Sequence, residues 1–201
     1  IMAFSLFACG KDEVKEYSDV TFTVLDATKG NNEKEEATSL FDADASTKWC
    51  VVNFSKAEVI VEANKPIKIK GYSFVTGNDN SYFNGRNPMD WELSGSNDNK
   101  SWVTLDEQSG NSDIPDKDKV KCDFPVFGVD EEYKYFKLEI TKVQSGECMQ
   151  LSEFVLDYNG SEYICNNLSD DNTSAKPVVT PSTSTSTTSS SAAQTNPTQA
   201  P

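Results

Sequence analysis

The stretch from residue 86 to residue 107, RNPMDWELSGSNDNKSWVTLDE, constrains the fold more than any other part of the chain. Apolar and polar residues alternate over positions 90–94, as in a strand with one buried face, and a second such run begins at Trp102. Pro88 suits the start of a strand because it has no N–H to give to a central ladder. The residues between the two runs favour a tight reversal: Gly95, Asn97, Asp98 and Asn99. The segment therefore predicts a β-hairpin in which Trp91 is buried.

Strand periodicity continues along the rest of the chain. Apolar and polar residues alternate over positions 20–24, 67–70 and 136–141, and Gly, Asn, Asp and Pro separate these short runs. No window carries a helical apolar stripe longer than two turns, and no apolar span in the sequence is long enough for a membrane helix. The pattern predicts an all-β sandwich whose inner faces interdigitate.

Composition excludes several classes of function. The chain has 32 Asp and Glu against 18 Lys and Arg, a net charge of −14, and no histidine. Nucleic acids and anionic membranes both require clustered basic residues, so neither is an expected partner. Without histidine, Ser and Cys lack their usual general base, and no acid carries a motif that marks it as a proton donor. We therefore expect a non-catalytic protein whose natural metal chemistry uses oxygen ligands.

The two ends differ in composition from the middle. Residues 1–9, IMAFSLFAC, are similar to the end of a signal segment, and LFAC followed by Gly10 resembles a bacterial lipobox. This predicts a lipoprotein acylated at Cys9, held to the cell surface by that anchor alone, with residues 10–16 as a charged spacer; the alternative is an ordinary secretory signal. Residues 166–201 are rich in Ser, Thr, Ala and Pro, which indicates a disordered linker or tail, or an O-glycosylated stalk.

A loop near residue 44 has the composition of a calcium site. Carboxylates and hydroxyls crowd together at Asp42, Asp44, Ser46 and Thr47. Such a turn also frees backbone carbonyls, and calcium takes six to eight oxygen ligands. The alternative is that Asp42 and Thr47 only cap a turn.

Five segments, in order, resemble one known family. The chain is similar to the discoidin domains, also called coagulation-factor C-type domains, and to carbohydrate-binding modules with a galactose-binding-like jelly roll. The segments are SLFDADASTKW at 39–49, GYSF at 71–74, RNP at 86–88 with Trp91, YFKLEI at 135–140 and QLSEFVL at 150–156. The resemblance implies a jelly-roll β-sandwich over residues 17–165. One departure is Ala43, where the family usually has glycine.

The resemblance also implies a ligand set for structural calcium. By position, the ligands are the Ser39 carbonyl, Asp42, the carbonyl or carboxylate of Asp44, Thr47, and Glu153 from the last core strand. The alternative for Glu153 is a solvated strand residue.

A glycan is the ligand that the resemblance implies. In sugar-binding members, loops at one end of the sandwich present an aromatic platform beside polar side chains. The loop at 77–86 supplies such a set: Asp79, Tyr82, Phe83, Asn84 and Arg86. Arg86 has a structural alternative, in which it stacks on Trp91 or holds loop carbonyls. The alternative function is adhesion, in which the same loops bind a protein or another surface ligand.

Five cysteines leave four if Cys9 is the lipid anchor, and four cysteines allow three connectivities. If the calcium site implied by the resemblance is correct, the fold brings Cys50 close to Cys148. That pairing leaves Cys122 with Cys165. The alternative is buried free thiols.

Overall fold

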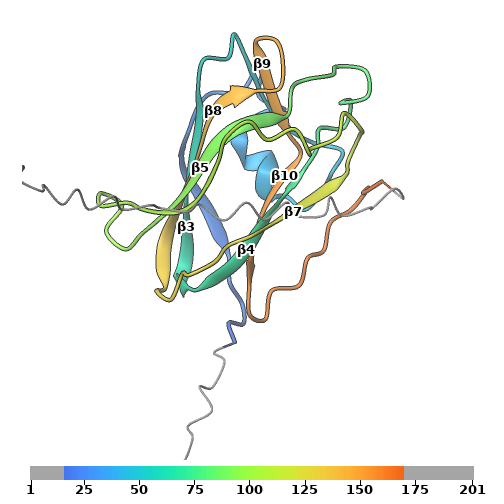
Figure 1. Cartoon of the computed structure of the whole chain (residues 1–201). Helices are drawn as coiled ribbons and strands as arrows, with labels where there is room; N and C mark the ends of the chain where they lie inside the picture. Colours follow the sequence, from blue (N-terminus) through green and yellow to red (C-terminus); the bar gives the residue numbers. More distant parts are fainter. Residues whose placement is uncertain (1–15, 170–201) are drawn as a thin grey trace, which may run out of the picture.

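The computed structural model describes residues 16–169, and its architecture is shown in Figure 1. The predictions for Cys9, for the spacer before residue 16 and for the chain after residue 169 fall outside the described residues. Within residues 16–169, no helix is long and apolar enough to cross a membrane.

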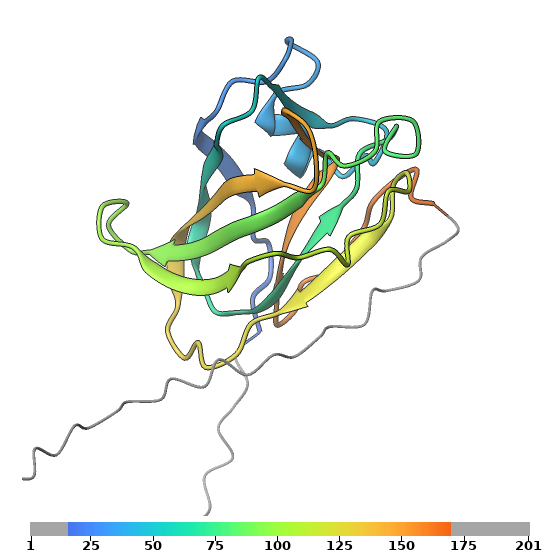
Figure 2. The ribbon, with the colours of Figure 1, turned by 45° about the horizontal axis from the view of Figure 1, so that its top comes forward.

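The described chain is built from antiparallel β-sheets (Figures 1 and 2). The largest sheet has five strands in the order β1 (Phe22–Ala27), β3 (Ala57–Ile67), β8 (Tyr133–Val143), β5 (Pro88–Ser96) and β6 (Val103–Gln108). The second has three, in the order β10 (Glu153–Tyr158), β4 (Ile69–Val75) and β7 (Lys121–Pro125). A short third sheet pairs β2 (Trp49–Val52) with β9 (Cys148–Leu151), and one short 3-10 helix, η1, spans Ala37–Phe41. The predicted all-β sandwich is confirmed.

An aromatic core fills the space between the two larger sheets. Trp91 on β5 is only 2% exposed, and its ring packs edge-on against Phe74 of β4 with centroids 5.3 Å apart. The indole N–H of Trp91 donates to the Tyr72 hydroxyl at 2.7 Å, and that hydroxyl donates to Asp106 of β6 at 2.6 Å. The polar atoms of the large side chains are therefore satisfied inside the core, as burial requires. The predicted burial of Trp91 is confirmed.

The predicted hairpin is present as β5 and β6, but one of its four predicted turn residues lies in a strand. Gly95 belongs to β5 and pairs with Val103, so it is not a turn residue. A Cβ at this glycine would lie 2.6 Å from the ring of Tyr133, which explains why the position has no side chain. The reversal depends on two of the predicted turn residues: Asn99, which has φ 55°, and Asp98, which accepts the N–H groups of Lys100 and Ser101.

Candidate functional site

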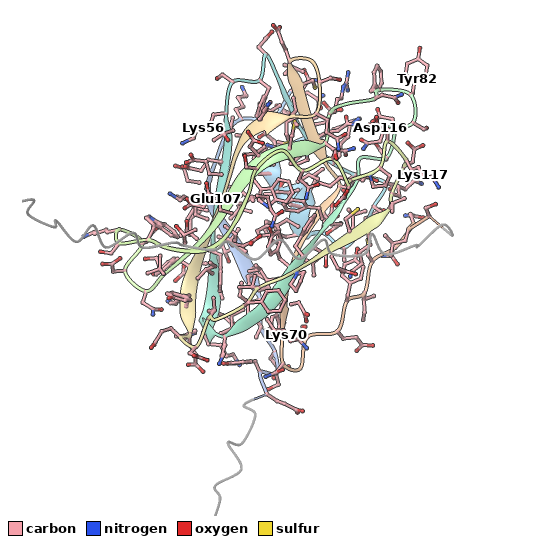
Figure 3. The ribbon with its side chains drawn as sticks, viewed as in Figure 1. Lys56, Lys70, Tyr82, Glu107, Asp116 and Lys117 are labelled. Atoms are coloured by element: carbon pink, nitrogen blue, oxygen red, sulfur yellow. The ribbon has the colours of Figure 1, made fainter. Side chains whose placement is uncertain are left out.

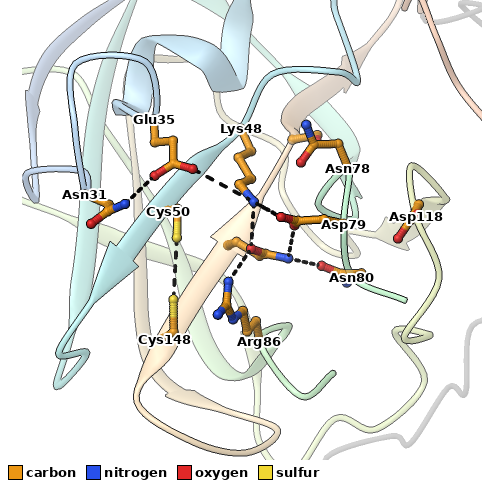
Figure 4. A network of polar contacts seen from close by, with 12 residues as sticks. Asn31, Glu35, Lys48, Cys50, Asn78, Asp79, Asn80, Arg86, Asp118 and Cys148 are labelled. Carbon is orange, nitrogen blue, oxygen red and sulfur yellow. Dashed lines mark hydrogen bonds and ion pairs between the residues drawn. The ribbon is translucent and has the colours of Figure 1, made fainter. Parts of the chain in front are cut away.

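The candidate ligand loop, residues 77–86, lies between β4 and β5 beside the small β2–β9 sheet (Figure 4). The ladder between β2 and β9 pairs Cys50 with Gln150. It therefore places Lys48, just before β2, and Gln150, within β9, next to the loop.

Lys48 is the central cation of a polar network. The residue is 7% exposed, and its Nζ lies 2.6 Å from each carboxylate oxygen of Asp79 and 4.0 Å from the carboxylate of Glu35. Nζ also donates to the Gln150 side-chain oxygen at 3.2 Å. A buried ammonium group is tolerated only when it is paired in this way. Asp79 therefore anchors the loop and is not a free group for a ligand.

Gln150 extends the network to the rest of the loop. Its side chain is fully buried, and its amide N–H groups donate to Asp79 at 3.0 Å and to Asn80 at 2.6 Å. Its oxygen accepts from Lys48 and from Arg86, the latter at 3.2 Å. Gly77 makes room for this side chain, because a Cβ there would lie 2.7 Å from the Gln150 amide nitrogen. The loop is therefore fixed by β9 along much of its length.

Two aromatic residues project from the tip of the loop. Tyr82 is 81% exposed and Phe83 is 38% exposed, and their rings meet edge to face with centroids 4.7 Å apart. Tyr82 points away from the sandwich in Figure 3. The guanidinium of Arg86 lies 3.9 Å from the centroid of the Phe83 ring, a cation–π contact. Arg86 thus stacks on Phe83, whereas the structural alternative placed it on Trp91. Its NH1 group also donates to Gln150.

Acidic residues of the segment before β7 hold the back of the loop. Asp116 accepts the N–H of Gly85 at 2.8 Å, and Asp118 accepts both the N–H and the hydroxyl of Ser81, at 2.7 and 3.0 Å. Gly85 has φ 79°, where other residues are strained, and a Cβ there would clash with the side chain of Ser145. These contacts therefore fix the backbone conformation of the loop.

Asn84 belongs to the scaffold of this loop. In the orientation that satisfies its hydrogen bonds, its amide donates to the carbonyls of Asn80 and Ser81 at 2.9 and 3.2 Å. Of the five predicted ligand residues, Tyr82 and Phe83 present the exposed surface, Arg86 backs it, and Asp79 and Asn84 hold the loop in shape.

Sequence reasoning missed Lys48 and Gln150, although both occur in segments that were singled out for other reasons. The network joins Lys48 to Asp79 and to Gln150 across sequence separations of 31 and 102 residues. Only the pairing of β2 with β9 brings them together. No local pattern carries that information.

The predicted calcium loop and Glu153 lie together. Glu153 is 2% exposed, and its carboxylate accepts the N–H of Asp44 at 2.8 Å. The hydroxyl of Thr47 donates to the Asp42 carboxylate at 2.7 Å and lies 3.0 Å from the Asp44 carbonyl. Burial, followed by the negative charge of Asp42, raises the pKa of Glu153 to about 8. Glu153 is therefore buried, and the alternative prediction of a solvated strand residue is wrong. Thr47 does cap the turn, as the other alternative predicted.

The carboxylate of Asp44 is committed elsewhere. It accepts from the Asn167 amide at 2.7 Å and from the N–H and hydroxyl of Ser46, and these bonds, led by Asn167, lower its pKa. The backbone carbonyl of Asp44 accepts from the Thr47 hydroxyl at 3.0 Å. Ser39 lies within η1. Among residues 16–169, no group of three or more Asp, Glu, Cys and His side chains converges as a metal site. Calcium here would therefore depend on two carboxylates, one hydroxyl and backbone carbonyls, which are oxygen ligands of the type it prefers.

Cys50 and Cys148 lie next to each other. Their Sγ atoms are 3.4 Å apart, and both residues are thiols. Burial, followed by the neighbouring thiol, raises the pKa of Cys50 to about 12. Cys122 is buried on β7 with its sulfur 4.0 Å from the Val120 carbonyl, and the Cys165 sulfur lies 3.4 Å from the Asn166 carbonyl. Both disulfide pairings stay predictions.

One family of known proteins matches most of this fold. Residues 22–154 match the F5/8 type C domain family. The chain belongs to this family. The F5/8 type C domain accounts for most of the described residues, from β1 to β10. No curated protein sequence matches the chain.

Solved structures similar to this F5/8 type C domain share its fold at low sequence identity. A chitosan-binding module of a Paenibacillus sp. IK-5 chitosanase/glucanase has 17% identity and a TM-score of 0.52, with 68% of this chain and 92% of that one covered. The family 32 carbohydrate-binding module of Streptococcus pneumoniae EndoD has 15% identity and a TM-score of 0.53, with 69% and 95% covered. The C-terminal domain of a Bacteroides fragilis chitobiase has 17% identity and a TM-score of 0.55, with 69% and 93% covered.

Proposed function

We propose that this chain is a non-catalytic, cell-surface or secreted carbohydrate-binding module with a structural calcium site. The observation that carries the proposal is the exposed pair Tyr82 and Phe83, backed by Arg86 on a loop that is fixed from behind. The C–H face of a sugar ring packs on aromatic rings, and its vicinal hydroxyls take paired hydrogen bonds from a planar guanidinium. Similar folds that are named as carbohydrate-binding or chitosan-binding modules support this choice.

The rigidity of the loop favours affinity for a small ligand. Lys48, Gln150, Asp116 and Asp118 already hold Asp79, Asn80, Ser81 and Gly85 of the loop, so little ordering is left to occur on binding. The same contacts occupy the nearby carboxylates, which leaves them poorly suited to transfer protons in catalysis. Recognition without chemistry is the role that fits this arrangement.

Calcium in this proposal is held by Asp42, Glu153, the Thr47 hydroxyl, and the carbonyls of Asp44 and Ser39. Support comes from the buried Glu153 beside the charge of Asp42, because two close carboxylates are stabilised when a divalent cation neutralises them. The ion would join the loop before β2 to the start of β10. Export and a lipid anchor at Cys9 rest on the sequence of residues 1–9.

A glycan array probed with the full chain tests the proposed function. We expect binding to a restricted set of glycans, lost in Tyr82→Ala and in Phe83→Ala. Phe127→Ala is the matched control, because Phe127 is 72% exposed but lies outside the loop. Absence of any glycan signal, together with capture of one specific surface protein that Tyr82→Ala no longer binds, would replace this proposal with the adhesion alternative.

A further inference from the structure

A cavity lies on the three-stranded sheet, and no residue of the loop at 77–86 lines it. It has a volume of about 730 Å³ and is bounded by β4, β7, β10 and the segment that follows β10. Figures 1 and 2 show this segment turning after β10 and running back beside β7. Small-molecule sites commonly have volumes of about 300 to 1,000 Å³, so the cavity is large enough for one.

The segment after β10 is fastened at both ends. Near its start, the N–H of Tyr17 donates to the Asn159 carbonyl at 3.0 Å. Near its end, the N–H of Asn166 donates to the Ala43 carbonyl at 2.8 Å, and the N–H of Ser169 donates to the Lys119 carbonyl at 3.0 Å. Residues 160–165, here called the strap, therefore span the cavity.

The strap carries a tyrosine whose hydroxyl has no strong hydrogen-bond partner. The hydroxyl oxygen of Tyr163 is buried, and its polar neighbour is the thiol of Cys165, a weak partner. Burial, followed by the neighbouring Cys165 thiol, raises the pKa of Tyr163. A buried hydroxyl without a strong partner is unfavourable. A ligand oxygen in the cavity would supply that partner.

The other lining groups identify the kind of ligand. Both lysines that line the cavity are paired: Lys70 lies 3.5 Å from Asp157, and Lys121 contacts Asp123. Ser73 donates to Asp123 at 2.6 Å, so hydroxyl and carboxylate groups stand together on the floor. Val155 and the strap supply apolar surface between them. Paired charges give little attraction for an ion, whereas hydroxyls beside apolar surface suit a neutral polyol ring.

We propose that the cavity beneath the strap is a second binding site, for a neutral sugar of one or two rings, independent of the Tyr82 loop. The sugar hydroxyls would bond Tyr163, Ser73 and Asp123, and its apolar face would pack against Val155. The chain would then hold two sugar sites on different faces, which raises avidity for a polymer when both sites are engaged.

Nuclear magnetic resonance of the isotope-labelled full chain tests this site. The probes are galactose, N-acetylglucosamine and cellobiose, each at roughly 10 mM, enough to occupy a site with a Kd near ~1 mM. We expect at least one of them to shift the amide signals of residues 71–73, 155 and 161–164. Tyr82→Ala should leave these shifts unchanged. Val155→Trp, which fills the cavity with a strand-compatible side chain, should abolish them.

Tyr163→Phe separates a ligand contact from a role in folding. Without sugar, this variant should melt at the same temperature as the parent or higher, because it removes a buried hydroxyl that has no strong partner. Its affinity for the sugar should fall about threefold to tenfold, the loss expected for one hydrogen bond. The proposal is overturned if none of the three sugars shifts these signals, or if the shifts disappear in Tyr82→Ala. Failure of the Tyr82 loop to bind glycans would leave the site under the strap unaffected.

Discussion

At the scale of single residues, Ala43 departs from local backbone preference. Its φ is 59°, the left-handed region that glycine adopts freely and other residues adopt at a cost. The glycine usual in the family is absent, yet the turn is kept, because the carbonyl of Ala43 accepts from Asn166 and the next residue donates to Glu153. Contacts on both sides of the turn therefore impose a conformation that the residue itself disfavours.

Ala43→Gly should stabilise the domain by about 1 kcal/mol, since it relieves this strain at the smaller cost of extra freedom in the unfolded chain. Urea denaturation measures the change. Ala45→Gly is the control: Ala45 is fully buried nearby and its φ is not positive, so its replacement should destabilise. An Ala43→Gly variant as unstable as Ala45→Gly would show that the left-handed turn carries no strain.

At the scale of elements, the small β2–β9 sheet organises the loop, through Lys48 before one strand and Gln150 within the other. Lys48→Met should lower stability by about 1 to 3 kcal/mol, because it removes the buried cation that Asp79 and Gln150 share. The lower part of this range is expected, since the Asp79 side chain is 33% exposed and water screens the lost pair. Glycan affinity should also fall, because the loop loses its anchor.

Lys56→Met is the matched control for that variant. Lys56 lies 2.6 Å from Glu139, but its side chain is 50% exposed, so breaking this pair should change stability by less than about 1 kcal/mol. Thermal melting and calorimetry with the glycan identified on the array compare the two. Equal effects of both substitutions would mean that Lys48 does not position the loop.

The contact between Cys50 and Cys148 gives a chemical prediction for the same sheet. Oxidised glutathione should convert the pair to a disulfide: each thiol loses its proton, and two electrons reduce glutathione disulfide to two glutathione thiols. Thiol titration of the unfolded protein should then detect two fewer thiols than before. Cys50→Ser should abolish the loss and Cys122→Ser should not. An unchanged thiol count after oxidation would leave these cysteines as free core thiols.

Strands and hydrophobic burial were accessible from sequence because each depends on neighbours in the chain. Alternation around Trp91 placed β5 correctly. The loop sequence also identified Tyr82 and Phe83 as its aromatic residues, and both are exposed. The role of Gly95 was not accessible, because it depends on a tyrosine ring that packs on it from β8. Lys48 and Gln150 were missed for the same reason: their partners are set by strand pairing, and no local pattern encodes that pairing.

At the scale of the whole molecule, the loop before β2 and the start of β10 meet at Asp42 and Glu153. Calcium at about 100 times its Kd should add about 2.7 kcal/mol to the free energy of unfolding, and EDTA should remove this gain. Glu153→Gln should no longer respond to calcium. Glu62→Gln, on β3 and paired with Lys134, should respond as the parent does. An EDTA-treated parent with an unchanged melting temperature, and no ion released on unfolding, would contradict the calcium proposal.

The protein is an acidic β-sandwich whose loop at 77–86 exposes the aromatic side chains of Tyr82 and Phe83. The central claim is that this loop binds a glycan. Titration calorimetry of the full chain with the strongest glycan from the array tests it most directly. We predict that Tyr82→Ala weakens binding tenfold or more, equivalent to about 1.4 kcal/mol, with an unchanged melting temperature, while Phe127→Ala binds as the parent does. Equal affinity of the parent and Tyr82→Ala would contradict the claim.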